Sequence, residues 1–199
     1  MKDVIMRIEK EAKEESIPII EKDSIKFIMK YIKLNNVKSI LEIGTAVGYS
    51  AILMASVSDD IEITTIERDE KRYIRAVSNV NECGLDKRIE VVFQDALEAN
   101  LVGRSYDIIF IDAAKSQNIK FFEKFSHYLS PNGIIITDNM NFHGLVGGET
   151  SELSKNVSSM IRKIEEYKEF LKNNEEFTTK FYDIGDGLSI SFRNYDERR

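Results

Sequence analysis

The sequence predicts an α/β fold with a doubly wound, mostly parallel sheet of seven strands and helices on both faces. Two observations carry this prediction. Short segments rich in β-branched residues alternate with stretches of helical spacing, five times in succession, and this alternation is typical of parallel strands joined by right-handed helical crossovers. The alternation stops near the end of the chain. Two β-rich segments follow each other there across the Gly185–Gly187 turn and predict an antiparallel hairpin.

The elements follow from these patterns in order. Two helices precede the first strand, over residues 3–15 and 22–34. The five parallel strands are expected over residues 37–44, 61–67, 88–95, 106–112 and 133–139. Helices are expected between them over residues 49–58, 68–84 and 116–130. A long polar helix over residues 151–172 leads into the closing strands, 176–184 and 188–194.

Length and composition indicate one ordinary globular domain. The 199 residues carry 28 Lys and Arg against 34 Asp and Glu, a formal net charge of −6, which argues against a broad electrostatic grip on nucleic acid. We expect a single domain over residues 1–199, with the helices of residues 1–36 packing on it. The only cysteine, Cys83, excludes an internal disulfide. No signal peptide or membrane-spanning segment is evident, so we expect a cytoplasmic protein.

A glycine turn follows the first parallel strand in residues 40–51, ILEIGTAVGYSA. Gly44 and Gly48 bracket the turn and Glu42 precedes it, so we count these three among the cofactor-binding residues. Glycine lets the backbone approach a ligand closely. The G-x-x-x-G spacing differs from the G-x-G-x-x-G of dinucleotide sites. A tight turn whose glycines serve only packing is the alternative.

The next two strands end in polar residues suited to a nucleoside. Glu67 follows the glycine turn by about twenty residues, where an acid accepts hydrogen bonds from ribose hydroxyls. Asp95 and Ala96 end the third strand, and a carboxylate beside a backbone N–H suits the amino group and a ring nitrogen of adenine. Three successive strand ends with matched groups predict a nucleoside-type cofactor.

The fourth and fifth strands also end in oxygen donors. Asp112 ends one, and Asp138 and Asn139 end the other. Because neighbouring parallel strands end at the same edge of a sheet, we expect these side chains to converge. A divalent cation would remove the repulsion between the carboxylates, and oxygen ligands favour Mg²⁺ over Ca²⁺ in our interpretation. The alternative is that these residues are helix caps and loop acids.

Lys115 follows Asp112 by three residues and faces the same expected edge. We interpret Lys115 as the general base toward a substrate hydroxyl, and Lys115 and Asp112 as the catalytic residues. His143 is a second candidate for the base or a pocket wall. The glycines at 144, 147 and 148 suggest that its loop can close over a substrate.

Six segments, LEIGTAVGYSA, TIE, QDA, FIDAAK, TDN and GDGL, together resemble the cation-dependent O-methyltransferases, the class of the catechol and caffeoyl-CoA enzymes. The resemblance covers residues 16–191. It implies a Rossmann-like class I methyltransferase fold, S-adenosylmethionine as cofactor and a homodimer. The S-adenosylmethionine site implied by the resemblance consists of Ile20, Ser50, Glu67, Asp95, Ala96 and Asp112. Its cation, Mg²⁺ or Mn²⁺, would bind Asp112, Asp138 and Asn139.

Within that class the chain looks most similar to bacterial tRNA 5-hydroxyuridine methyltransferases, on the segments SIPIIEKDS, FHGLV and IGDGLSIS. This implies methylation of the wobble uridine in a tRNA anticodon loop, giving 5-methoxyuridine. Such a partner would require a local basic rim, for which the candidates are Lys115, Lys120, Lys124, Lys155, Arg162, Lys163, Arg193, Arg198 and Arg199. Each cluster is equally well explained as solvated helix surface.

Three alternatives remain open at this stage. A methyltransferase for small catechols or phenols would use the same cofactor and cation, and the acidic balance favours it. A non-catalytic nucleotide-binding module would have no need of the predicted cation ligands. A nicotinamide-dependent dehydrogenase disagrees with the glycine spacing and with the terminal hairpin.

Overall fold

A seven-stranded sheet forms the centre of the molecule, in the strand order β3-β2-β1-β4-β5-β7-β6. The computed structural model describes residues 1–141, 146 and 154–194. The first five strands run parallel, and β7 is antiparallel to both β5 and β6. The predicted sheet is thus confirmed. Its strands are β1 Ser39–Ile43, β2 Glu62–Glu67, β3 Ile89–Phe93, β4 Tyr106–Ile111, β5 Leu129–Thr137, β6 Phe177–Tyr182 and β7 Leu188–Arg193.

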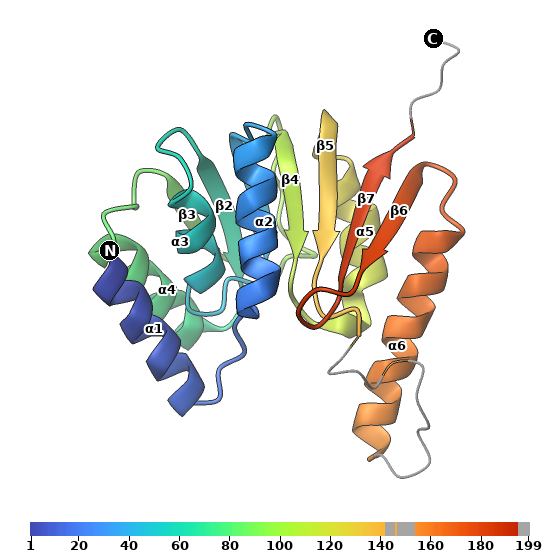
Figure 1. Cartoon of the computed structure of the whole chain (residues 1–199), viewed down its shortest axis with the longest axis horizontal. Coiled ribbons are helices and arrows are strands. Elements are labelled where there is room, and N and C mark those ends of the chain that lie inside the picture. Colours follow the sequence, from blue (N-terminus) through green and yellow to red (C-terminus); the bar gives the residue numbers. More distant parts are fainter. Residues whose placement is uncertain (142–145, 147–153, 195–199) are drawn as a thin grey trace.

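Helices cover both faces of this sheet, with α2 in front of it and α5 behind it in Figure 1. The helices are α1 Lys2–Glu14, α2 Lys22–Leu34, α3 Tyr49–Ala55, α4 Glu70–Glu82, α5 Asn118–Ser126 and α6 Lys155–Lys172, and a short 3-10 helix, η1 Lys115–Gln117, precedes α5. No helix in the described part of the chain is both long and apolar enough to cross a lipid bilayer.

Alternation along the strands produces two hydrophobic cores. In β1, Ile40 packs with side chains of α1 to α4 on one face, whereas Leu41 packs with α5 and α6 on the other. In β4, Ile108 and Ile109 divide in the same way. This division follows from the two-residue period of a strand. The near-continuous apolar runs of the parallel strands therefore reflect burial on both faces.

Several element boundaries differ from the predicted ones for local reasons. α4 ends at Glu82, so Cys83 is its C-cap, and Gly84 closes the helix in the left-handed conformation with φ +69°. β5 begins at Leu129, because that residue already pairs with Tyr106 before a register shift in β4. α6 begins at Lys155, with the Ser154 side chain accepting a hydrogen bond from the Val157 backbone N–H.

The strand order reverses between β1 and β4, since β2 and β3 lie on one side of this pair and β5 on the other. Such a switch point leaves room for a ligand outside the carboxyl ends of the strands. The loop after β1 and the loop after β4 lead away from this point. They carry Gly44 and Asp112, two of the predicted site residues.

Candidate active site

A pocket of about 380 Å³ opens at the carboxyl ends of β1, β2 and β4, and we call it the strand-end pocket. It lies at the switch point of the sheet. The predicted site residues that line it are Ile20, Gly44, Ser50, Glu67, Asp95, Ala96, Asp112, Lys115 and Asn139. Three others, Glu42, Gly48 and Asp138, are not in its lining.

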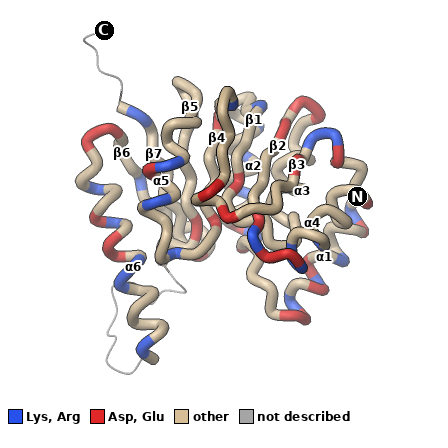
Figure 2. The backbone as a smooth tube through the Cα atoms, turned by 180° about the vertical axis from the view of Figure 1, so that it is seen from behind, with Lys and Arg blue, Asp and Glu red and all other residues tan. Residues whose placement is uncertain are grey.

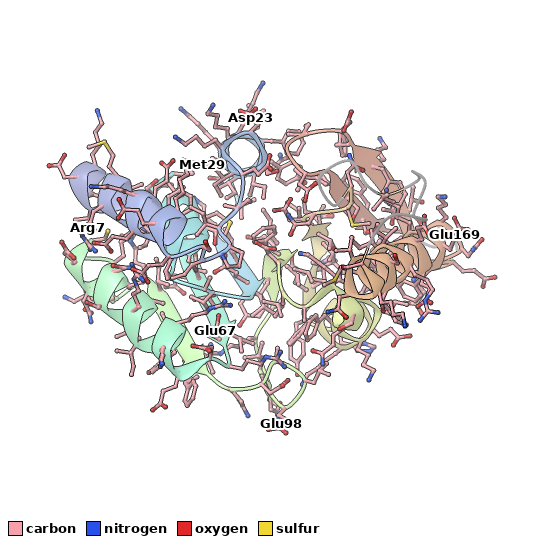
Figure 3. All side chains as sticks on the ribbon, turned by 90° about the horizontal axis from the view of Figure 1, so that it is seen from below. Arg7, Asp23, Met29, Glu67, Glu98 and Glu169 are labelled. Carbon is pink, nitrogen blue, oxygen red and sulfur yellow. The ribbon has the colours of Figure 1, made fainter. Side chains whose placement is uncertain are left out.

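Backbone N–H groups hold the carboxylate of Glu67 in one position. Its Oε1 accepts hydrogen bonds from the N–H groups of Arg68 and Asp69, both at 2.9 Å, and its Oε2 accepts one from Ala46 at 2.8 Å. A carboxylate offers about four acceptor sites, so one site remains, on Oε2, for a ligand hydroxyl. In Figure 3, Glu67 lies well inside the outline of the molecule, whereas Glu98 and Glu169 lie at its edge.

Gly44 allows the loops after β1 and β4 to touch. It has φ +101°, and a Cβ at this position would lie 2.1 Å from the backbone oxygen of Asp112. No residue with a side chain fits there without displacing Asp112. Gly48, with φ +82°, instead begins α3 and packs beside Ala76, where a Cβ would be 3.5 Å away. The structure therefore brings Gly44, and not Gly48, to the strand-end pocket.

Glu42 lies beneath the pocket instead of in it. Its side chain is fully buried and accepts hydrogen bonds from the hydroxyl groups of Ser50 and Thr65. Burial raises the pKa of Glu42 to about 8, against the lowering effect of these two hydrogen bonds. Ser50 stands between Glu42 and the pocket, so we correct the expected direct contact: Glu42 is placed to hold Ser50.

The far end of the pocket carries Asp95 and Ala96. Asp95 Oδ1 accepts a hydrogen bond from the Leu97 backbone N–H at 2.8 Å, which fixes the carboxylate. Its Oδ2 lies 3.6 Å from Nη1 of Arg68. Arg68 also lines the pocket. A ligand amino group that bound Asp95 would therefore compete with, or rearrange, the Arg68 guanidinium.

Asp112, Lys115, Asp138 and Asn139 meet at the other end. The Lys115 ammonium lies 3.1 Å from Asp112 Oδ1 and 3.4 Å from the backbone oxygen of Asp138. Asn139 Nδ2 lies 3.4 Å from Asp138 Oδ2, and Ser24 Oγ lies 3.5 Å from Asp138 Oδ1. The sequence prediction that these strand ends converge is thus matched by the geometry. Asn139 has φ +60°, an uncommon conformation for a residue other than glycine.

Asp138 is the most strongly perturbed member of this group. It is 1% exposed, and burial raises its pKa well above the ordinary range, with the neighbouring charge of Asp112 acting in the same direction. Two close carboxylates and an amide oxygen are a donor set that suits a hard divalent cation, whose charge would offset this repulsion. No group of three or more His, Cys, Asp or Glu arranged for a metal occurs among residues 1–141, 146 and 154–194.

The pocket also contains residues that sequence reasoning missed. Arg68 and Gln94 directly neighbour predicted residues at strand ends, so their positions alone could have indicated them. Phe121 of α5 and Met160 of α6 carry no such signal, because helix packing decides which of their residues reach the strand ends. The remaining unpredicted lining residues include Pro18, Ile19, Thr45, Ala46, Tyr49, Arg72 and Gln117.

The predictions for the loop after Asn139 and for a basic rim are not supported by the described residues. His143 and the glycines at 144, 147 and 148 lie outside the described residues, as do Arg198 and Arg199. Several residues of the expected basic rim contact acids: Arg162 and Lys163 pair with Glu166, and Arg193 pairs with Glu176. Basic and acidic segments alternate along α6 in Figure 2.

Known proteins resemble this chain over most of its length. The model of the O-methyltransferase family matches residues 2–194. A caffeoyl-CoA O-methyltransferase of Populus kitakamiensis is 27% identical over 186 residues, covering 89% of this chain and 78% of its own. A catechol O-methyltransferase of Niastella koreensis is 32% identical over 132 residues, covering 63% of this chain and 60% of its own.

Solved structures agree with these relatives. A Staphylococcus aureus protein described as a "putative caffeoyl-CoA O-methyltransferase" is 41% identical, with a TM-score of 0.91 over 96% of this chain and 92% of its own. The chain belongs to the O-methyltransferase family. It is an S-adenosylmethionine-dependent O-methyltransferase with a Rossmann-like fold.

Proposed function

We propose that this enzyme is cation-dependent and methylates a hydroxyl group that neighbours a second oxygen atom. One observation carries the proposal: Asp112 lines the strand-end pocket and also lies in the acidic group with Asp138 and Asn139. Asp112, together with Asn139, which also lines the pocket, thus joins the pocket suited to a nucleoside cofactor and the oxygen donors suited to a cation. Two adjacent substrate oxygens would complete the coordination that three protein ligands leave open.

Each residue then has a defined task. Glu67 would accept a hydrogen bond from a ribose hydroxyl, and Asp95 and Ala96 would bind the adenine. Bound S-adenosylmethionine supplies a methyl group on a sulfonium, and a bound Mg²⁺ or Mn²⁺ would supply Lewis acidity that favours ionisation of the substrate hydroxyl. Lys115, whose Nζ lies beside Asp112, stays our candidate for the group that accepts the hydroxyl proton, a role that it would perform as the neutral amine. Holding both reactants in one orientation would contribute much of the rate.

The substrate that we favour is 5-hydroxyuridine at the wobble position of tRNA. Its C5 hydroxyl neighbours the C4 carbonyl oxygen, so the base offers the required pair of oxygens. Anticodon-loop bases are partly unstacked, which lowers the cost of presenting one to a pocket. The support comes from this chemistry and from the segments near residues 16–24 and 184–191, since ion pairing on α6 weakens the argument from a basic rim.

A small catechol or phenol is the second candidate. The names of the Niastella and Populus relatives favour it, and a catechol offers the same pair of adjacent oxygens. Neither candidate changes the roles assigned to the cofactor or the cation. The homodimer implied by the resemblance stays a prediction.

Methyl transfer from labelled S-adenosylmethionine separates these possibilities. Acceptors would be tRNA from a strain that accumulates 5-hydroxyuridine and a panel of catechols, each with Mg²⁺ and with excess chelator. We expect label in the tRNA, located by nucleoside mass spectrometry at 5-methoxyuridine, and loss of transfer on chelation. Label in catechols alone would refute the tRNA substrate. Full activity after chelation would refute the cation.

A further inference from the structure

The glycine turn after β1 contains a strained residue that is held from two sides. Ala46 has φ +46°, a left-handed conformation that costs a residue with a side chain roughly 1–2 kcal/mol. Its N–H donates to Glu67 Oε2 at 2.8 Å. The backbone oxygen of the next residue, Val47, accepts a hydrogen bond from Asn79 Nδ2 of α4, also at 2.8 Å. The strained turn is therefore fastened on one side to the predicted ribose ligand and on the other to Asn79.

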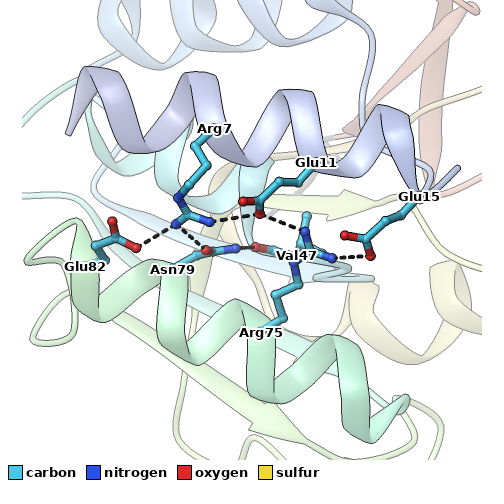
Figure 4. A network of polar contacts seen from close by, with 7 residues as sticks. All are labelled: Arg7, Glu11, Glu15, Val47, Arg75, Asn79 and Glu82. Carbon is cyan, nitrogen blue, oxygen red and sulfur yellow. Dashed lines mark hydrogen bonds and ion pairs between the residues drawn. The ribbon is translucent and has the colours of Figure 1, made fainter.

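Asn79 connects this turn to the N-terminal helix. Its side chain is buried, with 2% of the residue exposed, and its Oδ1 accepts a hydrogen bond from Arg7 Nη2 of α1 at 3.2 Å. Both polar atoms of the Asn79 amide are therefore hydrogen-bonded, the oxygen to the Arg7 guanidinium and the nitrogen to the Val47 carbonyl oxygen. The same Arg7 nitrogen also donates to Glu82 at 2.6 Å. Figure 4 shows this chain of contacts from α1 through α4 to the turn.

A second set of contacts ties the end of α1 to α4. Arg75 donates to Glu11 at 2.9 Å and to Glu15 at 2.6 Å, and Glu11 also accepts from Arg7 at 2.9 Å. Glu15 directly precedes the segment whose residues Pro18 to Ile20 line the strand-end pocket. Apolar contacts add to these ion pairs, because Ile8 and Ala12 of α1 are buried in the core shared with α3 and α4.

From these contacts we infer that Asn79 is a positioning residue for cofactor binding, and that α1 sets its orientation through Arg7. Asn79 keeps the Val47 carbonyl turned toward α4, which holds the Ala46 N–H on Glu67. Without that hydrogen bond the turn can relax from its strained conformation and withdraw the N–H that orients the Glu67 carboxylate. This inference rests on the proposed assignment of the strand-end pocket to S-adenosylmethionine.

Cofactor binding and the docking of α1 must affect each other equally, so the coupling can be measured on α1 itself. If docked α1 strengthens cofactor binding, the bound cofactor must strengthen the docking of α1 by the same factor. Amide hydrogen exchange in residues 2–14 should therefore slow when S-adenosylhomocysteine binds. A purely structural role of Asn79 would lower the stability of the fold but leave α1 insensitive to the ligand.

Three variants test the two links separately. Asn79→Asp keeps the size of the side chain and the partner for Arg7 but replaces the donor to Val47 with an acceptor. Arg7→Met keeps the hydrogen bond between Asn79 and Val47 and removes the hydrogen bond between Asn79 and α1. Asn81→Ala, on the same helix at an exposed position, is the matched control. Each protein is measured for its dissociation constant for S-adenosylhomocysteine by calorimetry, for kcat at saturating S-adenosylmethionine, and for hydrogen exchange with and without ligand.

We expect Asn79→Asp to weaken S-adenosylhomocysteine binding about tenfold and Arg7→Met about threefold, with kcat at saturation changed less than about twofold. Both variants should lose the ligand-induced protection of α1, and Asn81→Ala should match the wild type. Unchanged dissociation constants in folded variants would overturn the inference, as would wild-type α1 that ligand does not protect. If Asn79→Asp fails to fold, Arg7→Met still decides. Failure of the wild type to bind the ligand would instead refute the pocket assignment.

Discussion

Three buried acids at the strand ends differ in what surrounds their carboxylates. Glu67 accepts three backbone hydrogen bonds, Glu42 accepts two from hydroxyl groups, and Asp138 faces a second carboxylate. Hydrogen bonds to a charged form stabilise it, whereas burial and a like charge destabilise it. These surroundings suit Glu67 to bind hydroxyl donors, Glu42 to support the turn, and Asp138 to bind a cation.

Substitution of Asp138 and of Glu67 should separate cation function from cofactor function. Asp138→Ala is expected to abolish methyl transfer and Mn²⁺ binding while S-adenosylhomocysteine affinity stays within a few-fold. Glu67→Ala should weaken S-adenosylhomocysteine binding at least tenfold, since it removes the charged acceptor for a ribose hydroxyl, and a hydrogen bond to a charged group contributes about 1.5–3 kcal/mol. Titration calorimetry with Mn²⁺ and with S-adenosylhomocysteine measures the two affinities of each variant. Parallel losses in the two variants would contradict the division of roles.

Glu42 should make stability depend on pH in an unusual direction. Its pKa is about 8 in the folded protein and has an ordinary value of 4.5, so between these values the folded state holds a proton that the unfolded state has lost. Folding stability therefore falls as pH rises through this window, by up to about 1.4 kcal/mol per pH unit from this group. Glu42→Gln removes the titration.

Urea denaturation from pH 5.5 to 7.5 measures this effect as the difference between Glu42→Gln and wild type. The variant should gain relative stability steadily as the pH rises. A difference that stays constant over this range would show that Glu42 titrates with an ordinary pKa in the folded protein.

At the scale of elements, the connection between β6 and β7 supports the acidic end of the site. The N–H groups of Met140 and Asn141 donate to the backbone oxygens of Gly187 and Asp186, at 2.9 Å and 2.8 Å. Ser24, in the first turn of α2, lies within 3.5 Å of Asp138 and 3.4 Å of the Ile184 backbone oxygen. A hairpin turn, a helix start and a strand end thus meet beside Asp138. Their close packing leaves little room for larger side chains.

Gly185→Ala should test that packing. Gly185 has φ +56°, and a Cβ there would lie 2.2 Å from Ser24 Oγ. Gly103, with φ +78°, has no heavy atom within 4 Å of the corresponding position. Gly103→Ala is therefore the matched control, which incurs only the backbone cost of about 1–2 kcal/mol.

Gly185→Ala should lose about 1–3 kcal/mol more than this control, because it adds overpacking to the same conformational cost. Chemical denaturation measures both values. Equal losses for the two glycine variants would mean that the turn can move away from Ser24 freely.

At the scale of the whole molecule, one pocket draws on both halves of the sheet and on the N-terminal segment. Ile20 precedes α2, Glu67 ends β2, and Met160 belongs to α6, yet all three line the same cavity. A ligand that fills it contacts elements from both cores. Ligand binding should therefore stabilise the fold as a unit instead of one loop.

S-adenosylhomocysteine should raise the unfolding temperature of the protein. At a concentration 100-fold above its dissociation constant, a ligand stabilises the native state by about 2.7 kcal/mol. For a domain of this size that corresponds to about 5–10 °C. Scanning calorimetry with S-adenosylhomocysteine and with NAD makes the comparison, and the NAD sample should show no shift. A shift with NAD and none with S-adenosylhomocysteine would refute the assignment of the strand-end pocket to S-adenosylmethionine.

The sheet was predictable from local pattern because a strand buried on both faces must be apolar throughout, and a helix between such strands must have a helical period. The convergence of Asp112 and Asp138 was predictable for a related reason, since adjacent parallel strands end at one edge. The prediction that Glu42 contacts the cofactor was wrong, because strand alternation points its side chain away from the pocket, under Ser50. Boundaries such as the start of β5 depended on pairing with a distant strand.

The sequence alone determined the fold class, the edge of the sheet that carries the site and the oxygen-rich character of that edge, because each depends on residue order within short segments. Only the tertiary structure decided that Phe121 and Met160 reach the pocket, that Asn79 holds a strained turn, and that Arg7 contacts Asn79. These contacts join residues far apart in the chain. Their formation depends on how helices pack on the sheet, which local spacing does not specify.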